Sequence, residues 1–112
     1  MIRVDLYYNE DILYAFKLSG HAGYAEHGED IVCSAVSILV INTLNALEAL
    51  TEEEFSLNEV DSNSGVIDCV FNKRKQGKPN KEATLLLEAM LIGLKSVKQM
   101  YGEYIVIKNK FN

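Results

Sequence analysis

The feature that most constrains the fold is a repeated switch between two hydrophobic periods along the chain. Five short runs alternate apolar and polar side chains, as half-buried strands do: residues 2–9, 12–19, 55–61, 65–71 and 103–108. Two longer stretches have apolar residues at helical spacing instead: residues 30–52 and 81–101. The sequence therefore predicts the element order ββαββαβ.

This order favours an α/β fold, a two-layer sandwich with one mostly antiparallel sheet and two helices on one face. The 112 residues are enough for one hydrophobic core and too few for two ordinary domains, so we expect a single domain over 1–112. In the second run, alternation places Ile12, Tyr14, Phe16 and Leu18 on one face. Residues 72–80 are expected to form a polar loop whose lysines and arginine are solvated.

Charge and hydropathy exclude several classes of protein. A formal charge of −5 argues against direct nucleic-acid binding, which requires a basic face. The apolar run Ile31–Leu50 is about long enough to span a bilayer, but Asn42, Asn45 and Glu48 would be costly in lipid. A buried helix is the better interpretation. The N-terminal residues do not resemble a signal peptide, so we expect a cytoplasmic protein.

Cys33 is the first candidate for chemistry. If Asp30 caps the helix, Cys33 falls in its first turn, near unpaired backbone N–H groups and the positive end of the helix dipole. That environment stabilises a thiolate, the reactive form of cysteine. Cys33 could equally be a small core residue, as we expect for Cys69 on its strand. Position alone leaves both interpretations open.

His21 is the natural partner for this thiol. It follows a predicted strand at the start of the glycine-rich segment 20–29, which leads to the helix that carries Cys33. A connection of this length lets the strand end and the helix start approach each other. A histidine within hydrogen-bond reach would activate the thiol and later protonate the leaving amine. An ordinary solvated loop histidine is the alternative.

Other chemistries fit the sequence less well. The uniform spacing of His21, His27 and Cys33 matches no usual zinc pattern and lacks a fourth ligand, so we expect neither metal nor cofactor. A cysteine phosphatase would need arginine where Leu39 stands. A thiol redox protein would need a second cysteine near the first, and no Cys-x-x-Cys is present.

The segment Gly20-His21-Ala22, followed by Gly28-Glu29-Asp30-Ile31-Val32-Cys33-Ser34-Ala35-Val36-Ser37, resembles the signature of the ribosomal-processing cysteine proteases called Prp. The closing Gly-Glu-Tyr-Ile strand also fits. The resemblance implies that Cys33 is the nucleophile and His21 its general base. It matches Gly20, Asp30 and Ser37 to the loop glycine, aspartate and serine of the family, with Ser34 as a further supporting residue.

The same resemblance implies a function and a partner. The family removes the N-terminal extension of a ribosomal large-subunit protein and forms homodimers. A dimer would account for the apolar surface that Ile31, Ile38 and Ile41 add to the first helix. We also expect the Gly23–Gly28 segment to order over a bound peptide. The alternative is a non-enzymatic, dimeric, ribosome-associated binding protein in which Cys33 is structural.

Overall fold

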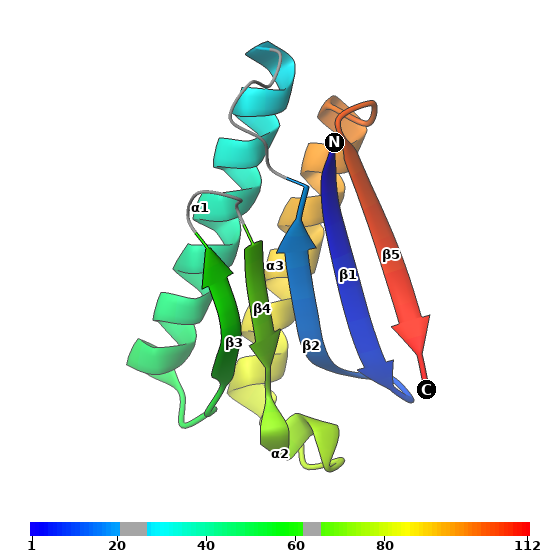
Figure 1. The fold of residues 1–112 in the computed structure, drawn as a ribbon. Coiled ribbons are helices and arrows are strands. Elements are labelled where there is room, and N and C mark those ends of the chain that lie inside the picture. The colour runs from blue at the N-terminus through cyan, green and yellow to red at the C-terminus, as the bar shows by residue number, and fades with distance from the viewer. Residues whose placement is uncertain (21–26, 62–65) are drawn as a thin grey trace.

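The computed structural model describes residues 1–20, 27–61 and 66–112 of the chain. In these residues five strands form one sheet in the order β3-β4-β2-β1-β5, and only the β1–β5 pair is parallel (Figure 1). The strands are β1 (Ile2–Asn9), β2 (Ile12–Ser19), β3 (Ser56–Asp61), β4 (Val66–Val70) and β5 (Ile105–Phe111).

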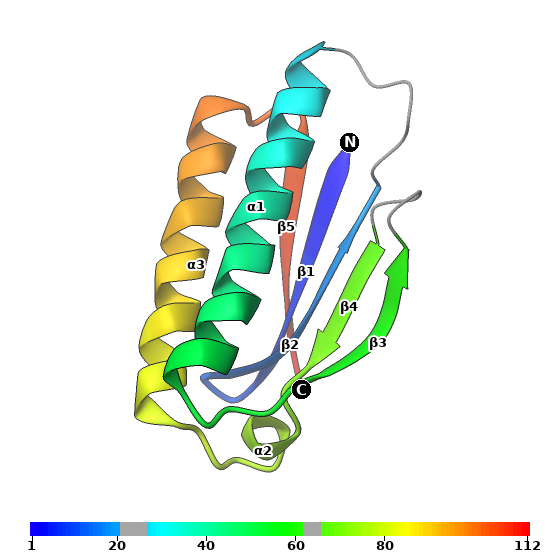
Figure 2. The same ribbon diagram turned by 90° about the vertical axis from the view of Figure 1, so that its left-hand side faces the viewer.

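Two long helices cover one face of this sheet and leave the other face open (Figure 2). The helices of the described chain are α1 (His27–Leu50), the short α2 (Asn72–Lys75) and α3 (Lys81–Met100). The predicted two-layer α/β sandwich with a mostly antiparallel sheet is confirmed. The short α2 is an addition to the predicted order.

The core lies between the sheet and the two long helices. Strand residues Ile2, Val4 and Leu6 point toward the helices and are almost completely buried. α1 is long and apolar enough to cross a membrane by length and composition. However, Val36 and Leu47 on its inner side are fully buried within this core. Its apolar character is therefore that of a core helix of this sandwich.

α1 and α3 pack closely side by side. A Cβ added at Gly93 of α3 would lie 2.6 Å from Cδ2 of Leu39 on α1, so a larger residue there would require the Leu39 side chain or the helix to move. The start of α3 is also fixed locally, because the Asn80 side chain accepts a hydrogen bond from the backbone N–H of Ala83 at 2.9 Å.

The prediction for the inward face of β2 is wrong in part. A β-bulge interrupts the pairing of β1 with β2 between Tyr7 and Tyr8. The bulge inserts one residue into the ladder and shifts the side-chain alternation. As a result Leu13, not Tyr14, joins Phe16 in the buried core, and Tyr14 is half-buried.

The prediction of a loop with solvated charges over residues 72–80 also needs correction. Asn72–Lys75 form the helix α2, and Arg74 is only 3% exposed. Its Nε donates to the carbonyl of Leu13 at 2.6 Å and its Nη1 donates to Oγ1 of Thr84 at 2.7 Å. Arg74 thus ties α2 to β2 and α3, because a buried guanidinium is stable only where its donors are satisfied.

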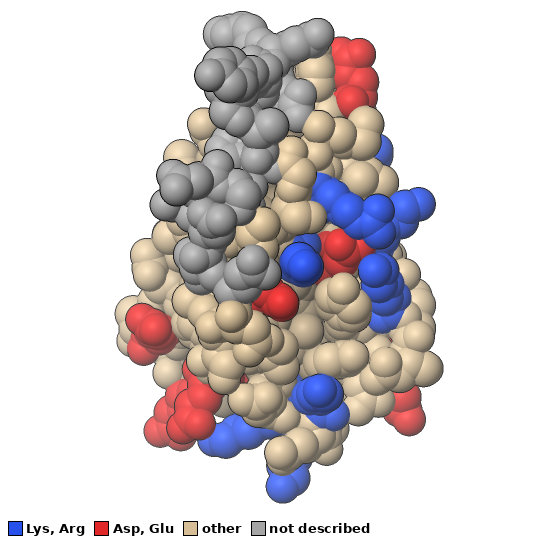
Figure 3. All heavy atoms as spheres, in the orientation of Figure 1, with Lys and Arg blue, Asp and Glu red and all other residues tan. Residues whose placement is uncertain are grey.

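The open face of the sheet carries a buried carboxylate among cations. Asp5 on β1 accepts two hydrogen bonds from Nε of Arg3, at 3.0 and 3.1 Å, and lies 3.4 Å from Nζ of Lys110 on β5. Figure 3 shows lysine and arginine side chains gathered around acidic atoms on this face. Burial opposes ionisation of Asp5, but the hydrogen bond from Arg3 and the charge of Lys110 outweigh it and lower the pKa of Asp5.

Candidate active site

The candidate site lies at the end of the molecule where β2 finishes and α1 begins (Figures 1 and 2). α1 starts at His27, three residues before the predicted start, so the expectation that Asp30 is the N-cap is wrong. Asp30 instead lies within the first turn, where a carboxylate is favourable because of the helix dipole. Cys33 accordingly lies in the second turn and not in the first.

Cys33 keeps its relation to the positive helix end despite this shift. Side chains on a helix lean toward its N-terminus, so the Cys33 side chain is directed toward the first turn of α1, whose backbone N–H groups have no acceptor within the helix. The residue is 7% exposed and belongs to the hydrophobic core cluster. The thiol therefore sits at the boundary between the core and the start of the helix.

Three polar residues lie close to Cys33 along α1. Asp30 precedes Cys33 by three residues and Ser37 follows it by four, so the three share one helix face. Asp30 is exposed and Ser37 is half-buried. Ser34 is exposed; it follows Asp30 by four residues and precedes Ser37 by three, so it borders the same face on the side away from Cys33.

The backbone conformation and the close packing at position 20 favour glycine. Gly20 follows the last residue of β2 and has a φ of +86°, a conformation that favours glycine. A Cβ at this position would also collide with the backbone carbonyl oxygen of Met1. Any side chain would displace this corner, which immediately precedes His21 in the sequence.

His21 itself lies outside the described residues, as does most of the Gly23–Gly28 segment; His27 and Gly28 belong to α1. Among the described residues, no group of three histidine, cysteine or acidic side chains is arranged to hold a metal ion.

Cys69 is buried in the core, as predicted, with no measurable exposed surface. Burial, reinforced by the neighbouring charge of Asp68, raises the pKa of the Cys69 thiol to about 12. Cys69 therefore stays protonated at neutral pH and is unsuited to act as a nucleophile.

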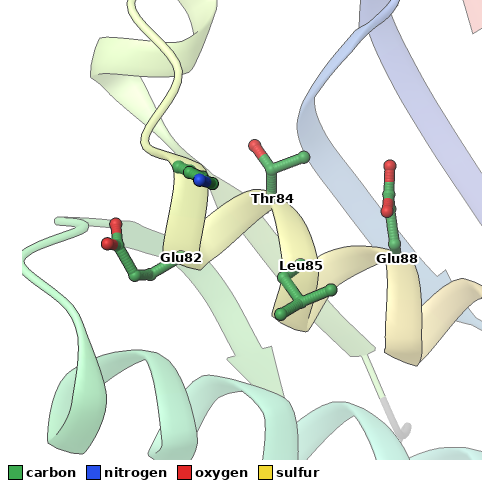
Figure 4. Close-up of a pocket in the computed structure, with 5 residues that line it drawn as sticks. Glu82, Thr84, Leu85 and Glu88 are labelled. Carbon is green, nitrogen blue, oxygen red and sulfur yellow. The ribbon is translucent and has the colours of Figure 1, made fainter.

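A hollow lies at the N-terminal end of α3, which is a different helix from the one that carries Cys33 (Figure 4). It has a volume of about 350 Å³, and its lining comes from this one helix: Lys81, Glu82, Thr84, Leu85 and Glu88. It holds neither a thiol nor an imidazole, so it offers no arrangement for nucleophilic catalysis.

Comparison with known families identifies the class of protein to which the chain belongs. The family model described as Cysteine protease Prp matches residues 1–106. The chain belongs to the Prp family of cysteine proteases. Two relatives carry the name Ribosomal processing cysteine protease Prp. The one from Staphylococcus aureus is 34% identical over 98% of this chain and 100% of the relative. The one from Bacillus subtilis is 30% identical over 81% of this chain and 80% of the relative.

Solved structures agree with this assignment. A crystal structure of Staphylococcus aureus Prp in complex with a substrate peptide has a TM-score of 0.87 and 32% identity, covering 98% of this chain and 100% of that one. The same enzyme with a covalently linked product peptide gives a TM-score of 0.84, with 33% identity and the same coverage. A Streptococcus mutans protein gives 0.85 with 34% identity, covering 100% of this chain and 96% of that one.

As a Prp family member, this chain is a cysteine peptidase, and the non-enzymatic binding protein is set aside. Sequence reasoning missed one feature near the site. An apolar hollow lies further along α1, between this helix and strands β3 and β4. Its residues come from segments far apart in the sequence, so no local sequence pattern predicts it.

Proposed function

We propose that this peptidase removes the N-terminal extension of a ribosomal large-subunit protein, with Cys33 as nucleophile and His21 as general base. The observation that carries the proposal is the placement of Cys33 on the first turns of α1, at the end of the molecule where Gly20 leads directly into His21. The names of the relatives, which specify ribosomal processing, support the substrate class.

The mechanism follows from this placement. His21 accepts the thiol proton as Cys33 Sγ attacks the scissile carbonyl carbon. Unpaired N–H groups in the first turn of α1 stabilise the oxyanion. His21 then gives its proton to the leaving amine, and a thioester links the extension to Cys33. Water, deprotonated by His21, hydrolyses the thioester and regenerates the thiol. The Staphylococcus aureus enzyme with a covalently linked product peptide supports a covalent step.

Two residues of α1 have supporting roles in this proposal. Asp30 shares a helix face with Cys33 and is positioned to orient the imidazole or the substrate backbone. Ser37 on the same face offers a hydroxyl one turn further along. Neither a metal nor another cofactor takes part. The reaction occurs in the cytoplasm on the free protein, without a membrane or direct nucleic-acid contact.

We further propose that one domain, residues 1–112, acts as a homodimer. The outward sides of both long helices carry large exposed apolar residues: Ile31 and Ile38 on α1, and Leu85 and Ile92 on α3. Ile38 and Ile92 are 69% and 67% exposed. Such a surface is typical of a self-complementary interface. Light scattering should give a mass twice that of one chain for wild type, and the mass of a single chain for Ile38→Asp. A wild-type monomer would contradict the dimer.

The experiment for the catalytic proposal compares wild type, Cys33→Ala and His21→Ala on the extended ribosomal protein. Intact mass spectrometry should show a single cut by wild type and none by either variant. Cys69→Ser is the matched control, because it changes the other thiol and should still cleave. Cleavage by Cys33→Ala, or an intact substrate after incubation with wild type, would overturn the proposal.

A further inference from the structure

The open face of the sheet, on the side opposite the two long helices, is basic although the whole chain carries a charge of −5. Strand register and the contacts of Asp5 place every charged residue of strands β1, β2, β4 and β5 on this face. The cations are Arg3, Lys17, Lys108 and Lys110, and the carboxylates are Asp5 and Asp68. In these strands the cations therefore outnumber the carboxylates (Figure 3).

A buried carboxylate organises the centre of this face. Asp5 is only 4% exposed and is held by Nε of Arg3 at 3.0 Å and by Nζ of Lys110 at 3.4 Å. Lys17 on β2 and Lys108 on β5 are directly paired with Asp5 on either side of β1. The two carboxylates of the face cannot balance these cations, and Lys108 is exposed to solvent. A local positive potential therefore remains for an anionic partner.

Two half-buried tyrosines lie next to these cations. The rings of Tyr7 on β1 and Tyr14 on β2 have centres 6.5 Å apart and planes tilted by 51°. Nζ of Lys110 lies 5.3 Å from the centre of the Tyr7 ring, and Nζ of Lys75 on α2 lies 5.9 Å from that of Tyr14. These cation–π contacts hold ammonium groups over the rings. A ligand on this face would meet aromatic surface between positive charges.

These features favour an acidic polypeptide over a nucleic acid. Recognition of single-stranded RNA uses aromatic rings whose faces are free to stack on bases, whereas lysines lie over both rings here. The net charge of −5 also repels a uniformly charged phosphate backbone. Separate carboxylates on a peptide can instead reach individual lysines and avoid Asp5 and Asp68.

We propose that the open sheet face docks an extended acidic segment of a partner protein. Lys17 and Lys108 belong to the strands on either side of β1, so their backbones are about 10 Å apart, twice the strand spacing. Carboxylates two or three residues apart on an extended chain are about 7 to 10 Å apart and can reach both lysines. The bound segment does not cover α1, which carries Cys33 on the other side of the sheet (Figure 2). This docking goes beyond the proposed peptidase function and does not depend on it.

The test measures the fluorescence anisotropy of a fluorescein-labelled peptide of alternating glutamate and threonine, titrated with the full chain at low salt. Wild type should bind this peptide, and the affinity should fall as salt screens the charges. A matched peptide with glutamine in place of glutamate should bind about tenfold more weakly. Equal affinity of wild type for the two peptides would overturn the proposal.

A double variant, Lys17→Gln with Lys108→Gln, tests whether binding occurs on the sheet. Its Kd for the glutamate peptide should rise about tenfold, because two ion pairs are lost. The matched control, Lys81→Gln with Lys95→Gln, removes the same charge from exposed positions of α3 and should bind as wild type does. Equal losses in the two double variants would reduce the effect to net charge and contradict docking on the sheet.

Further measurements distinguish other occupants of the face. If single-stranded oligouridine binds more tightly than the glutamate peptide and also requires Lys17 and Lys108, the face is a nucleic-acid site and the proposal is wrong. If light scattering shows a lower mass for the Lys17 and Lys108 double variant than for wild type, a second copy covers the face and the proposal is again wrong. Circular dichroism checks that each variant is folded. Cleavage of the extended ribosomal protein by this double variant should match wild type, so a failure of docking leaves the proposed function standing.

Discussion

At the scale of single residues, the two cysteines show how environment assigns opposite roles to one side chain. Cys33 is near the unpaired amides of a helix start, whereas Cys69 lies inside the sheet beside Asp68. The sequence could predict both placements, because one cysteine stands near the start of a long helical pattern and the other in an alternating strand. It could not predict that α1 begins at His27, since helix starts depend on tertiary contacts as well as cap preference.

The first prediction concerns thiol reactivity. Iodoacetamide at pH 7 should label wild type once, because the proposed mechanism requires a reactive Cys33 thiol, whereas burial raises the pKa of Cys69 to about 12. Intact mass after mild labelling should show one adduct on wild type and on Cys69→Ser, and none on Cys33→Ala. Equal labelling of Cys33→Ala and wild type would mean that Cys69 is the reactive thiol.

The second prediction concerns Gly20. Gly20→Ala should lower kcat/KM by at least tenfold, because its Cβ collides with the Met1 carbonyl and its φ of +86° disfavours alanine. Gly77 has a similar φ of +81° but open space around it, so Gly77→Ala is the matched control. It should reduce thermal stability slightly and leave cleavage unchanged. Equal kinetic effects of both variants would remove the link between Gly20 and the site.

At the scale of elements, the helices and strands followed their hydrophobic periods, and the departures have local causes. Tyr14 does not lie on the predicted buried face, because a β-bulge shifts the alternation of side chains by one residue. Arg74 is buried because its donors reach Leu13 and Thr84, which belong to distant segments. The pattern of a single sequence specifies neither the register of paired strands nor contacts between separate segments. Neither the bulge nor the burial of Arg74 could therefore be predicted from it.

The third prediction tests Arg74 as the tie between α2, β2 and α3. Arg74→Ala should lower the free energy of unfolding by about 3 kcal/mol, because it leaves buried acceptors unpaired. It also removes the cation nearest to Glu53, whose buried carboxylate oxygens have no hydrogen-bond partner among the described residues. Exposed Lys73→Ala should change stability by less than about 0.5 kcal/mol in the same urea titration. A comparable loss for both would contradict the tie.

At the scale of the whole molecule, the sandwich has two different faces. The helical layer exposes apolar residues, whereas the open sheet face carries Asp5 among Arg3 and Lys110. The overall charge of −5 did not indicate this local arrangement, because composition says nothing about which strands become neighbours. The parallel pairing of β1 with β5 brings Lys110 to Asp5, and the hollow beside α1 arises in the same way from distant segments.

The fourth prediction follows from the lowered pKa of Asp5. A carboxylate whose pKa is lower in the folded state contributes stability above its unfolded pKa, and this contribution is lost as the pH falls through the folded value. Asp5→Asn should therefore lower Tm relative to wild type at pH 7, and the gap should close as the pH drops below 3.8. Exposed Asp11→Asn should show no such gap. A gap for Asp5→Asn that is constant with pH would contradict the electrostatic account.

The central claim is that Cys33 forms a covalent acyl intermediate during cleavage of the ribosomal protein. The most direct measurement is intact and tandem mass spectrometry of wild type quenched in acid shortly after mixing with excess extended substrate. The account predicts an adduct with the mass of the removed extension minus one water, located on Cys33 and absent from Cys33→Ala. Cleavage without this adduct at any quench time, or an adduct on another residue, would contradict it.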